Sequence, residues 1–158
     1  MKKIHLGYFR NLIFGAEDSL VSTVGVLFGV ASTGEYSTRQ IIITGLIVIA
    51  VEALSMGAGS FLTEESLEEI DGKKFSKDKP YLEGIIMFFS YMIAGFVVLF
   101  PYIFIPVQNA KFVSVAFALV SLYLVGYIPR RNYKSGLRML IIAGLAILVG
   151  FIIGEILG

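Results

Sequence analysis

Long apolar segments alternate with short polar segments along the whole chain. Residues 84–110, 112–129 and 139–154 contain no charged side chain. An α-helix needs roughly 20 mostly apolar residues to cross the ~30 Å hydrocarbon core of a bilayer. The pattern therefore predicts an all-α membrane protein, a single domain over residues 1–158 with five transmembrane helices. We expect these spans near residues 7–33, 39–62, 82–102, 112–128 and 137–157.

The polar segments between the spans predict where the helices end. Residues 32–38 read Ser-Thr-Gly-Glu-Tyr-Ser-Thr and predict a turn. A helical pattern continues beyond the second apolar segment to Ile70, so we expect this second helix to extend into the cytoplasm. Residues 63–80 are expected to form that short extension and a basic linker. Proline lacks the backbone donor that a helix needs, so Pro101 and Pro106 should end or kink the third span.

The distribution of basic residues predicts the orientation of the helices. Five spans place the two termini on opposite sides of the membrane, and cytoplasmic loops carry an excess of Lys and Arg. A cytoplasmic N-terminus leaves only Arg39 and Lys111 on the outer side. The inner side then holds eleven of the thirteen basic residues, namely Lys2, Lys3, Arg10, Lys73, Lys74, Lys77, Lys79, Arg130, Arg131, Lys134 and Arg138.

The composition excludes several classes of protein. Apolar residues make up 56% of the chain and charged residues 16%, against about 25% charged in a typical soluble domain. The net charge is +1 and no basic stripe is present, so we expect no nucleic-acid partner. The chain has no Cys, which excludes disulfides and thiolate metal sites. No nucleophile–base set or phosphate loop is found, so we predict that the protein is not an enzyme.

Two acidic residues inside the predicted spans require an explanation. An ionisable group in mid-span costs about 2.5–3.5 kcal/mol on insertion scales, so Asp18 and Glu52 indicate a function. Met56 follows Glu52 by four residues and shares its helix face. Carboxylates combined with a thioether favour a divalent transition metal, although a helical Met more often only packs. The candidate metal ligands in the membrane are therefore Asp18, Glu52 and Met56.

The first span carries a stripe of small and polar residues. Two interpretations are open: a helix-lined polar path for ions, or a seam at which helices pack closely. Glu17 lies about 100° around the helix from Asp18 and would either line the path or bond across a helix interface. Ser22 belongs to the candidate path. The members of the stripe are Asn11, Gly15, Asp18, Ser22, Gly25 and Gly29.

A cluster of glutamates follows the second apolar segment. Its members form like-charged pairs four residues apart near a helix C-terminus, and both features destabilise a helix. One interpretation is a metal-binding entrance that collects cations; the other is a solvated face balanced by Lys73, Lys74, Lys77 and Lys79. Glu83 is expected to interact favourably with the N-terminus of the third helix. The cluster consists of Glu64, Glu65, Glu68 and Glu69.

Two segments resemble the vacuolar iron transporter family. Residues 10–22, Arg-Asn-Leu-Ile-Phe-Gly-Ala-Glu-Asp-Ser-Leu-Val-Ser, are similar to the family's Gly-x-x-Asp-Gly opening. Residues 55–62, Ser-Met-Gly-Ala-Gly-Ser-Phe-Leu, resemble its Ser-Met-Gly-x-Gly-x-Tyr-Leu segment. The family's second-helix Glu lies eight residues before the Met, where this chain has Val48. The family's plant members also carry a long cytoplasmic domain between spans two and three, for which residues 63–81 leave room only for a stub.

The resemblance implies a five-helix homodimer that exports Fe²⁺ or Mn²⁺ from the cytosol in exchange for protons. It implies a pathway between the first and second helices at the dimer interface and carries over Asp18 and Met56 as pathway residues. The metal ion would be a transported substrate, with no permanently bound cofactor. The partners would be divalent metal ions, protons, the lipid bilayer and a second copy. The membrane would be the cell membrane of a prokaryote, or a vacuolar-type membrane in a eukaryote.

Two other functions remain open from the residues alone. The protein could be a proton-coupled transporter of another small solute, with Met56 only packing. It could also be a membrane scaffold that transports nothing, with its glycine stripes used for assembly.

Overall fold

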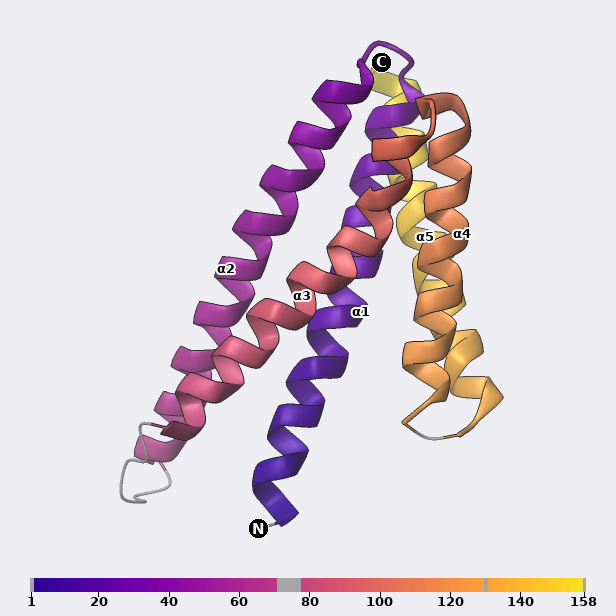
Figure 1. The fold of residues 1–158 in the computed structure, drawn as a ribbon. Coiled ribbons are helices and arrows are strands. Elements are labelled where there is room, and N and C mark those ends of the chain that lie inside the picture. The colour runs from indigo at the N-terminus through magenta and orange to yellow at the C-terminus, as the bar shows by residue number, and fades with distance from the viewer. Residues whose placement is uncertain (1, 71–77, 130, 158) are drawn as a thin grey trace.

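The fold is a bundle of five helices, given by a computed structural model that describes residues 2–70, 78–129 and 131–157 (Figure 1). Each helix is long and apolar enough to cross a membrane, and the described residues contain no strand. The all-α prediction with five spans is therefore confirmed. The helices are α1 (Lys2–Ser32), α2 (Thr38–Ile70), α3 (Asp78–Phe104), α4 (Val107–Tyr127) and α5 (Tyr133–Leu157).

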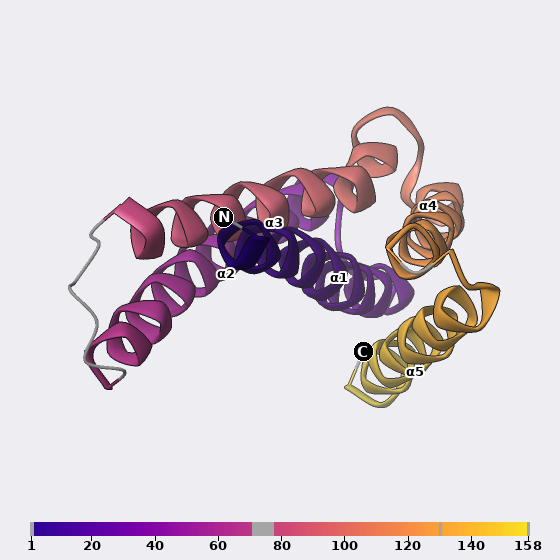
Figure 2. The same ribbon diagram turned by 90° about the horizontal axis from the view of Figure 1, so that it is seen from below.

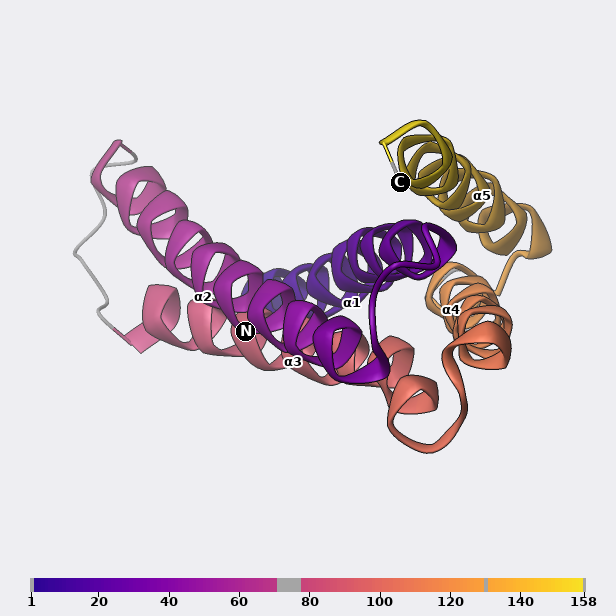
Figure 3. The same cartoon turned by 90° about the horizontal axis from the view of Figure 1, so that it is seen from above.

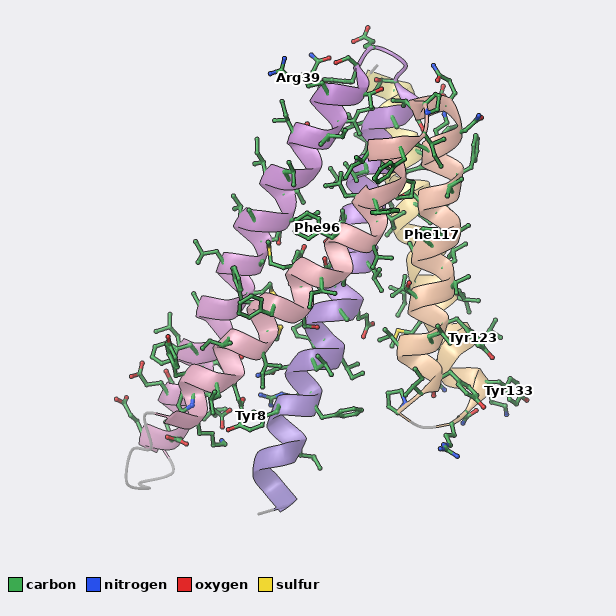
Figure 4. The ribbon with its side chains drawn as sticks, viewed as in Figure 1. Tyr8, Arg39, Phe96, Phe117, Tyr123 and Tyr133 are labelled. Carbon is green, nitrogen blue, oxygen red and sulfur yellow. The ribbon has the colours of Figure 1, made fainter. Side chains whose placement is uncertain are left out.

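The helix ends divide the molecule into two ends. The chain begins at one end, where α2 also finishes and α3 and α5 start (Figure 1). We call this the N-terminal end. The turns from α1 to α2 and from α3 to α4 lie at the opposite end, together with the C-terminus. Figure 4 shows Tyr8 and Tyr133 toward the N-terminal end and Arg39 at the other.

Helix α1 occupies the middle of the bundle and contacts all four other helices. The α2–α3 pair lies on one side of α1 and the α4–α5 pair on the other (Figures 2 and 3). The side chains of the buried core come from α1 to α5 and are almost all aliphatic. Its largest members are Leu20, Leu27, Ile41, Ile49, Leu99, Tyr102 and Leu122.

The turn between α1 and α2 follows from its local sequence. Gly34 adopts φ +76°, a left-handed conformation that glycine accepts without steric cost. Ser37 then precedes α2, and its backbone N–H and hydroxyl both donate to Gln40 Oε1, at 2.9 and 2.8 Å. A Ser followed three residues later by Gln forms a capping box, which satisfies donors that the first helical turn leaves unpaired.

The third helix differs from its predicted bounds at both ends. It starts at Asp78, so residues 78–80 belong to α3 and not to a linker. It also continues through Pro101 to Phe104, and the Pro101 carbonyl still accepts a bond from Ile105 N–H at 3.0 Å. Helix α2 reaches Ile70 as predicted, and residues 71–77 lie outside the described residues.

Glycines of the α1 stripe lie at close helix contacts. A Cβ at Gly25 would lie 3.2 Å from the Ala146 carbonyl oxygen of α5, and one at Gly29 only 2.6 Å from that of Gly150. A Cβ at Gly15 would lie 3.0 Å from the Met87 sulfur of α3. Small residues allow membrane helices to approach this closely. These three positions therefore form packing seams with α3 and α5, which is the second of the two interpretations of the stripe.

Candidate metal pathway

A cleft of about 1050 Å³ lies toward the N-terminal end, between α1, α2 and the α4–α5 connection. Glu17 of α1 and Met56 of α2 both line it, so the fold brings a carboxylate and a thioether from two different helices to one cavity. Gly59, one turn along α2 from Met56, has open space where a Cβ would be. The absence of a side chain there leaves room beside the thioether.

Two further thioethers line the same cleft. Met87 comes from α3 and Met139 from α5, so together with Met56 three helices each contribute one sulfur. A thioether favours softer transition-metal ions over Mg²⁺ and Ca²⁺. Sequence analysis did not identify Met87 or Met139 as candidates, although Met87 follows Glu83 at the same four-residue spacing that relates Met56 to Glu52.

Asp18 and Glu52 do not line this cleft. Asp18 is half-buried and Glu52 is exposed on the surface of the single chain. Tyr91 of α3 is buried in the bundle. The Tyr91 hydroxyl lies 2.7 Å from the Ser22 hydroxyl, in hydrogen-bond contact. Tyr91 therefore contacts the candidate Ser22 of α1, one helical turn from Asp18.

One face of α2 is polar or small and yet uncovered. Glu52, Ser55, Gly59 and Thr63 are all exposed, although they lie in a membrane span, and the last three form the α2 wall of the cleft. A carboxylate that faces lipid is costly, and such groups in membrane proteins almost always face protein or water. The uncovered face therefore calls for a partner surface.

The four glutamates at the end of α2 have different partners and different degrees of burial in the fold. Glu64 pairs with Arg10 of α1 (N···O 3.8 Å) and with Lys79 of α3, and Glu68 lies 3.9 Å from the Lys79 ammonium. Both glutamate side chains are largely buried, at 12% and 13% exposed, so they do not form a solvated face. Glu65 is half-buried and Glu69 is exposed. Lys73, Lys74 and Lys77, their other expected counter-ions, lie outside the described residues.

Glu83 lies further inside the third helix than the sequence predicts, because α3 begins at Asp78. It lies in the second turn of α3 and its side chain is 1% exposed. Asn11 Nδ2 donates to Glu83 Oε2 at 3.2 Å and also to Ser60 Oγ of α2 at 2.9 Å. Arg10 donates to the same Oε2 at 3.4 Å. Glu83 thus bonds to α1 and, through Asn11, is connected to α2 at the N-terminal end.

Within the described residues, no three His, Cys, Asp or Glu side chains gather closely enough to hold a metal ion. Comparison with known proteins supplies the family. The model of the VIT family matches residues 9–75 and 63–155, which together cover nearly the whole chain. The chain belongs to the vacuolar iron transporter (VIT) family. No curated protein matches it.

Membership in the VIT family decides the class of activity. The family consists of membrane transporters of metal ions such as iron and manganese, and not of enzymes. With its five apolar helices, this VIT protein is an integral membrane protein that transports metal ions. The resemblance found in the sequence is confirmed.

Proposed function

We propose that this VIT protein exports Fe²⁺ or Mn²⁺ from the cytosol by exchange for protons. The observation that carries the proposal is the cleft shared by Glu17 of α1 and Met56 of α2. A carboxylate binds any divalent cation, whereas a thioether disfavours Mg²⁺ and Ca²⁺. The pair is therefore suited to select a transition metal from a solution rich in Mg²⁺.

The proposed route from this cleft runs past Asp18 of α1 and Glu52 of α2. Glu52 lies one helical turn from Met56, about 6 Å along the axis, on the side away from the N-terminal end. Carboxylates bind either a metal ion or a proton, so Asp18 and Glu52 can alternate between the two. This alternation is the chemical basis for coupling metal efflux to proton uptake.

The proposed assembly is a homodimer in which α2 meets its copy. The exposed face with Glu52 and Gly59 is the support for it, because a second copy would cover the carboxylate that lipid cannot solvate. The described residues of one chain hold no group of three ligands for a metal ion, and a two-fold axis beside α2 would double the number of ligands. The ion path would then run between the two copies.

The proposed orientation places the N-terminal end in the cytosol, on the support of the excess of Lys and Arg at that end. The chain has no Cys, so single cysteines can be labelled without background. Lys134→Cys should react with an impermeant maleimide only from the cytosolic side, and Arg39→Cys only from outside. The reverse pattern would invert the proposed direction of transport.

Flux in liposomes tests the function. The purified protein should move Fe²⁺ and Mn²⁺ but not Mg²⁺, and a pH dye should report proton movement in the opposite direction. Asp18→Asn, which keeps the shape and removes the charge, should abolish both signals. Glu35→Gln is the matched control, because Glu35 is exposed in the α1–α2 turn.

The remaining alternatives give different results in the same assay. Proton movement that does not depend on metal would indicate another solute, and no flux of any kind would indicate a scaffold. Flux in Asp18→Asn at the wild-type rate would remove this carboxylate from the pathway.

A further inference from the structure

A groove of about 620 Å³ runs between α1 and α5 at the end opposite the N-terminal end. It begins at Val21, close to the middle of the Leu6–Ser32 span, and reaches Thr33 and Tyr36 in the turn after α1. The length from Val21 to Thr33 is about 18 Å at ~1.5 Å per residue, against ~15 Å for half of the hydrocarbon core. The groove therefore covers one leaflet of the bilayer and not the other.

The lining of this groove, which we call the α1–α5 groove, is mostly apolar. Aliphatic side chains such as Val26 and Val149 supply much of it, and its polar members are Ser22 at the inner end and Thr33 and Tyr36 at the outer end. A hydrocarbon chain gains van der Waals contacts on such a surface and needs no hydrogen bond there. The glycines of the groove add no side chain to it, and they are Gly25, Gly29, Gly150 and Gly154.

A smaller hollow of about 310 Å³, which we call the polar hollow, meets the outer end of the groove at Tyr36, which lines both. It lies between the turn that follows α1 and the turn that follows α3. Thr38, Gln108 and Lys111 line it, and each of these side chains offers a hydrogen-bond donor. The apolar groove thus ends beside a surface of donors at the edge of the membrane.

Lys111 gives the polar hollow a positive charge at a fixed position. Its Nζ lies 5.8 Å from the centroid of the Phe28 ring and 5.4 Å from that of Phe112. A cation is attracted to the faces of aromatic rings, so the two rings hold the ammonium at this place. None of the ion pairs within the described residues involves Lys111. The ammonium can therefore pair with an anion at the membrane surface.

We propose that the α1–α5 groove and the polar hollow together bind one anionic phospholipid from the leaflet at this end. One acyl chain lies in the groove, and the phosphate lies beside Tyr36 and Lys111. The length of the groove matches one leaflet, and the charge of Lys111 complements the headgroup. The inference goes beyond the proposed function and is independent of it, because neither hollow is lined by Asp18, Glu52 or Met56.

A helix of a second copy is the other candidate occupant of the groove, and it fits less well. The face of α2 that we assign to the dimer exposes the Glu52 carboxylate and two hydroxyl side chains. An apolar groove would leave these groups without hydrogen bonds, which is costly. A transmembrane helix also crosses both leaflets, whereas the groove covers only one.

Native mass spectrometry of the purified protein, titrated with phosphatidylglycerol in detergent, tests the groove. The wild type should bind one phospholipid per chain more tightly than any further lipid. Val149→Trp should weaken this first binding roughly tenfold, a loss of about 1.4 kcal/mol, because the indole takes the place of the acyl chain. Leu148→Trp is the matched control, since Leu148 is the neighbouring exposed residue of α5 but does not line the groove. It should bind the lipid as the wild type does.

A second comparison tests the headgroup. Lys111→Gln should lower the affinity for phosphatidylglycerol roughly fivefold, the effect of one Lys at an anionic surface, and should lower the affinity for zwitterionic phosphatidylcholine less. Arg39→Gln is the matched control, because Arg39 is the other basic residue at this end and lines neither hollow. It should leave both affinities unchanged.

Three results would overturn the inference. The first is equal phosphatidylglycerol affinity in Val149→Trp and Leu148→Trp. The second is an equal loss in Arg39→Gln and Lys111→Gln, which would indicate only a diffuse surface charge. The third is a dimer mass that Val149→Trp alone converts to a monomer mass, which would assign the groove to a second copy. Circular dichroism shows whether each variant remains helical, and Lys111→Gln tests the site without altering the groove.

Discussion

Glu17 and Asp18 are adjacent in the chain but have different surroundings. Glu17 lines the cleft with Met56, while Asp18 is half-buried and does not line it. Successive residues on a helix are about 100° apart, so neighbouring carboxylates face different helices. The two therefore have separate tasks in the proposed mechanism: Glu17 receives the metal in the cleft, and Asp18 exchanges metal for protons deeper in the bundle.

Glu52 replaces, in our interpretation, the carboxylate that the family places at the position of Val48. The two positions are four residues apart, so they share a face of α2 about 6 Å apart along the axis. An ion that travels along this face passes both levels. A carboxylate moved by one turn along this face can therefore still contact the ion, whereas a carboxylate on another face of α2 could not.

A rescue experiment tests this interpretation. Glu52→Gln should abolish metal flux and its pH dependence, and adding Val48→Glu should restore part of both in liposomes. Rescue is expected only if transport needs a carboxylate on this face of α2, and not one particular hydrogen bond made by Glu52. Glu155→Gln, an exposed carboxylate of α5, is the control and should be neutral. Normal flux in Glu52→Gln alone would exclude Glu52 from the mechanism.

Among the elements, α1 and α5 make a contact that depends on glycine. A Cβ at Gly150 would lie 2.1 Å from the Gly25 carbonyl oxygen, and one at Gly154 2.5 Å from that of Gly29. These are contacts with backbone, which cannot move aside as a flexible side chain can. The position of α5 against the central helix therefore depends on these four glycines.

Gly150→Ala should separate the two helices and destabilise the fold by roughly 1–3 kcal/mol, the usual cost of overpacking. Gly144→Ala is the matched control on the same helix, because a Cβ at Gly144 meets nothing within 4 Å. Thermal unfolding followed by circular dichroism in detergent should show a lower midpoint for Gly150→Ala only. Equal midpoints would mean that α5 adjusts without cost.

The sequence predicted the helices better than their contacts. Five spans and the end of α2 at Ile70 follow from runs of apolar residues and local stop signals, which depend only on nearby sequence. The crossing of the helices forms the ion pairs of Glu83 and brings the sulfurs of Met87 and Met139 to one cleft. No local sequence pattern records this crossing. The alternative of a packing seam for Gly25 was stated from the sequence, but only the contact with α5 decided it.

For the molecule as a whole, one face of α2 differs in composition from the rest of the exposed surface of the spans. Most exposed side chains of the spans are large and apolar, as lipid contact requires, with Ile93, Phe100 and Leu145 as examples. The face of α2 with Glu52, instead, exposes a carboxylate and small or hydroxyl side chains. Its composition suits contact with protein or with a water-filled path. A second copy that presents the same face would supply both.

Cysteine cross-linking tests whether α2 meets its copy along this face. In a symmetric dimer, residues close to the two-fold axis meet their own counterparts, and two cysteines can bridge when their Cβ atoms are about 4 Å apart. We therefore expect at least one of Ser55→Cys, Gly59→Cys and Thr63→Cys to form a disulfide-linked dimer on oxidation in native membranes.

Gly144→Cys on the exposed side of α5 is the control and should stay monomeric on a denaturing gel. The chain contains no other Cys, so each band has one origin. If none of the three α2 variants cross-links while the control remains monomeric, the dimer does not form through this face, and Glu52 must find its solvation within the single chain.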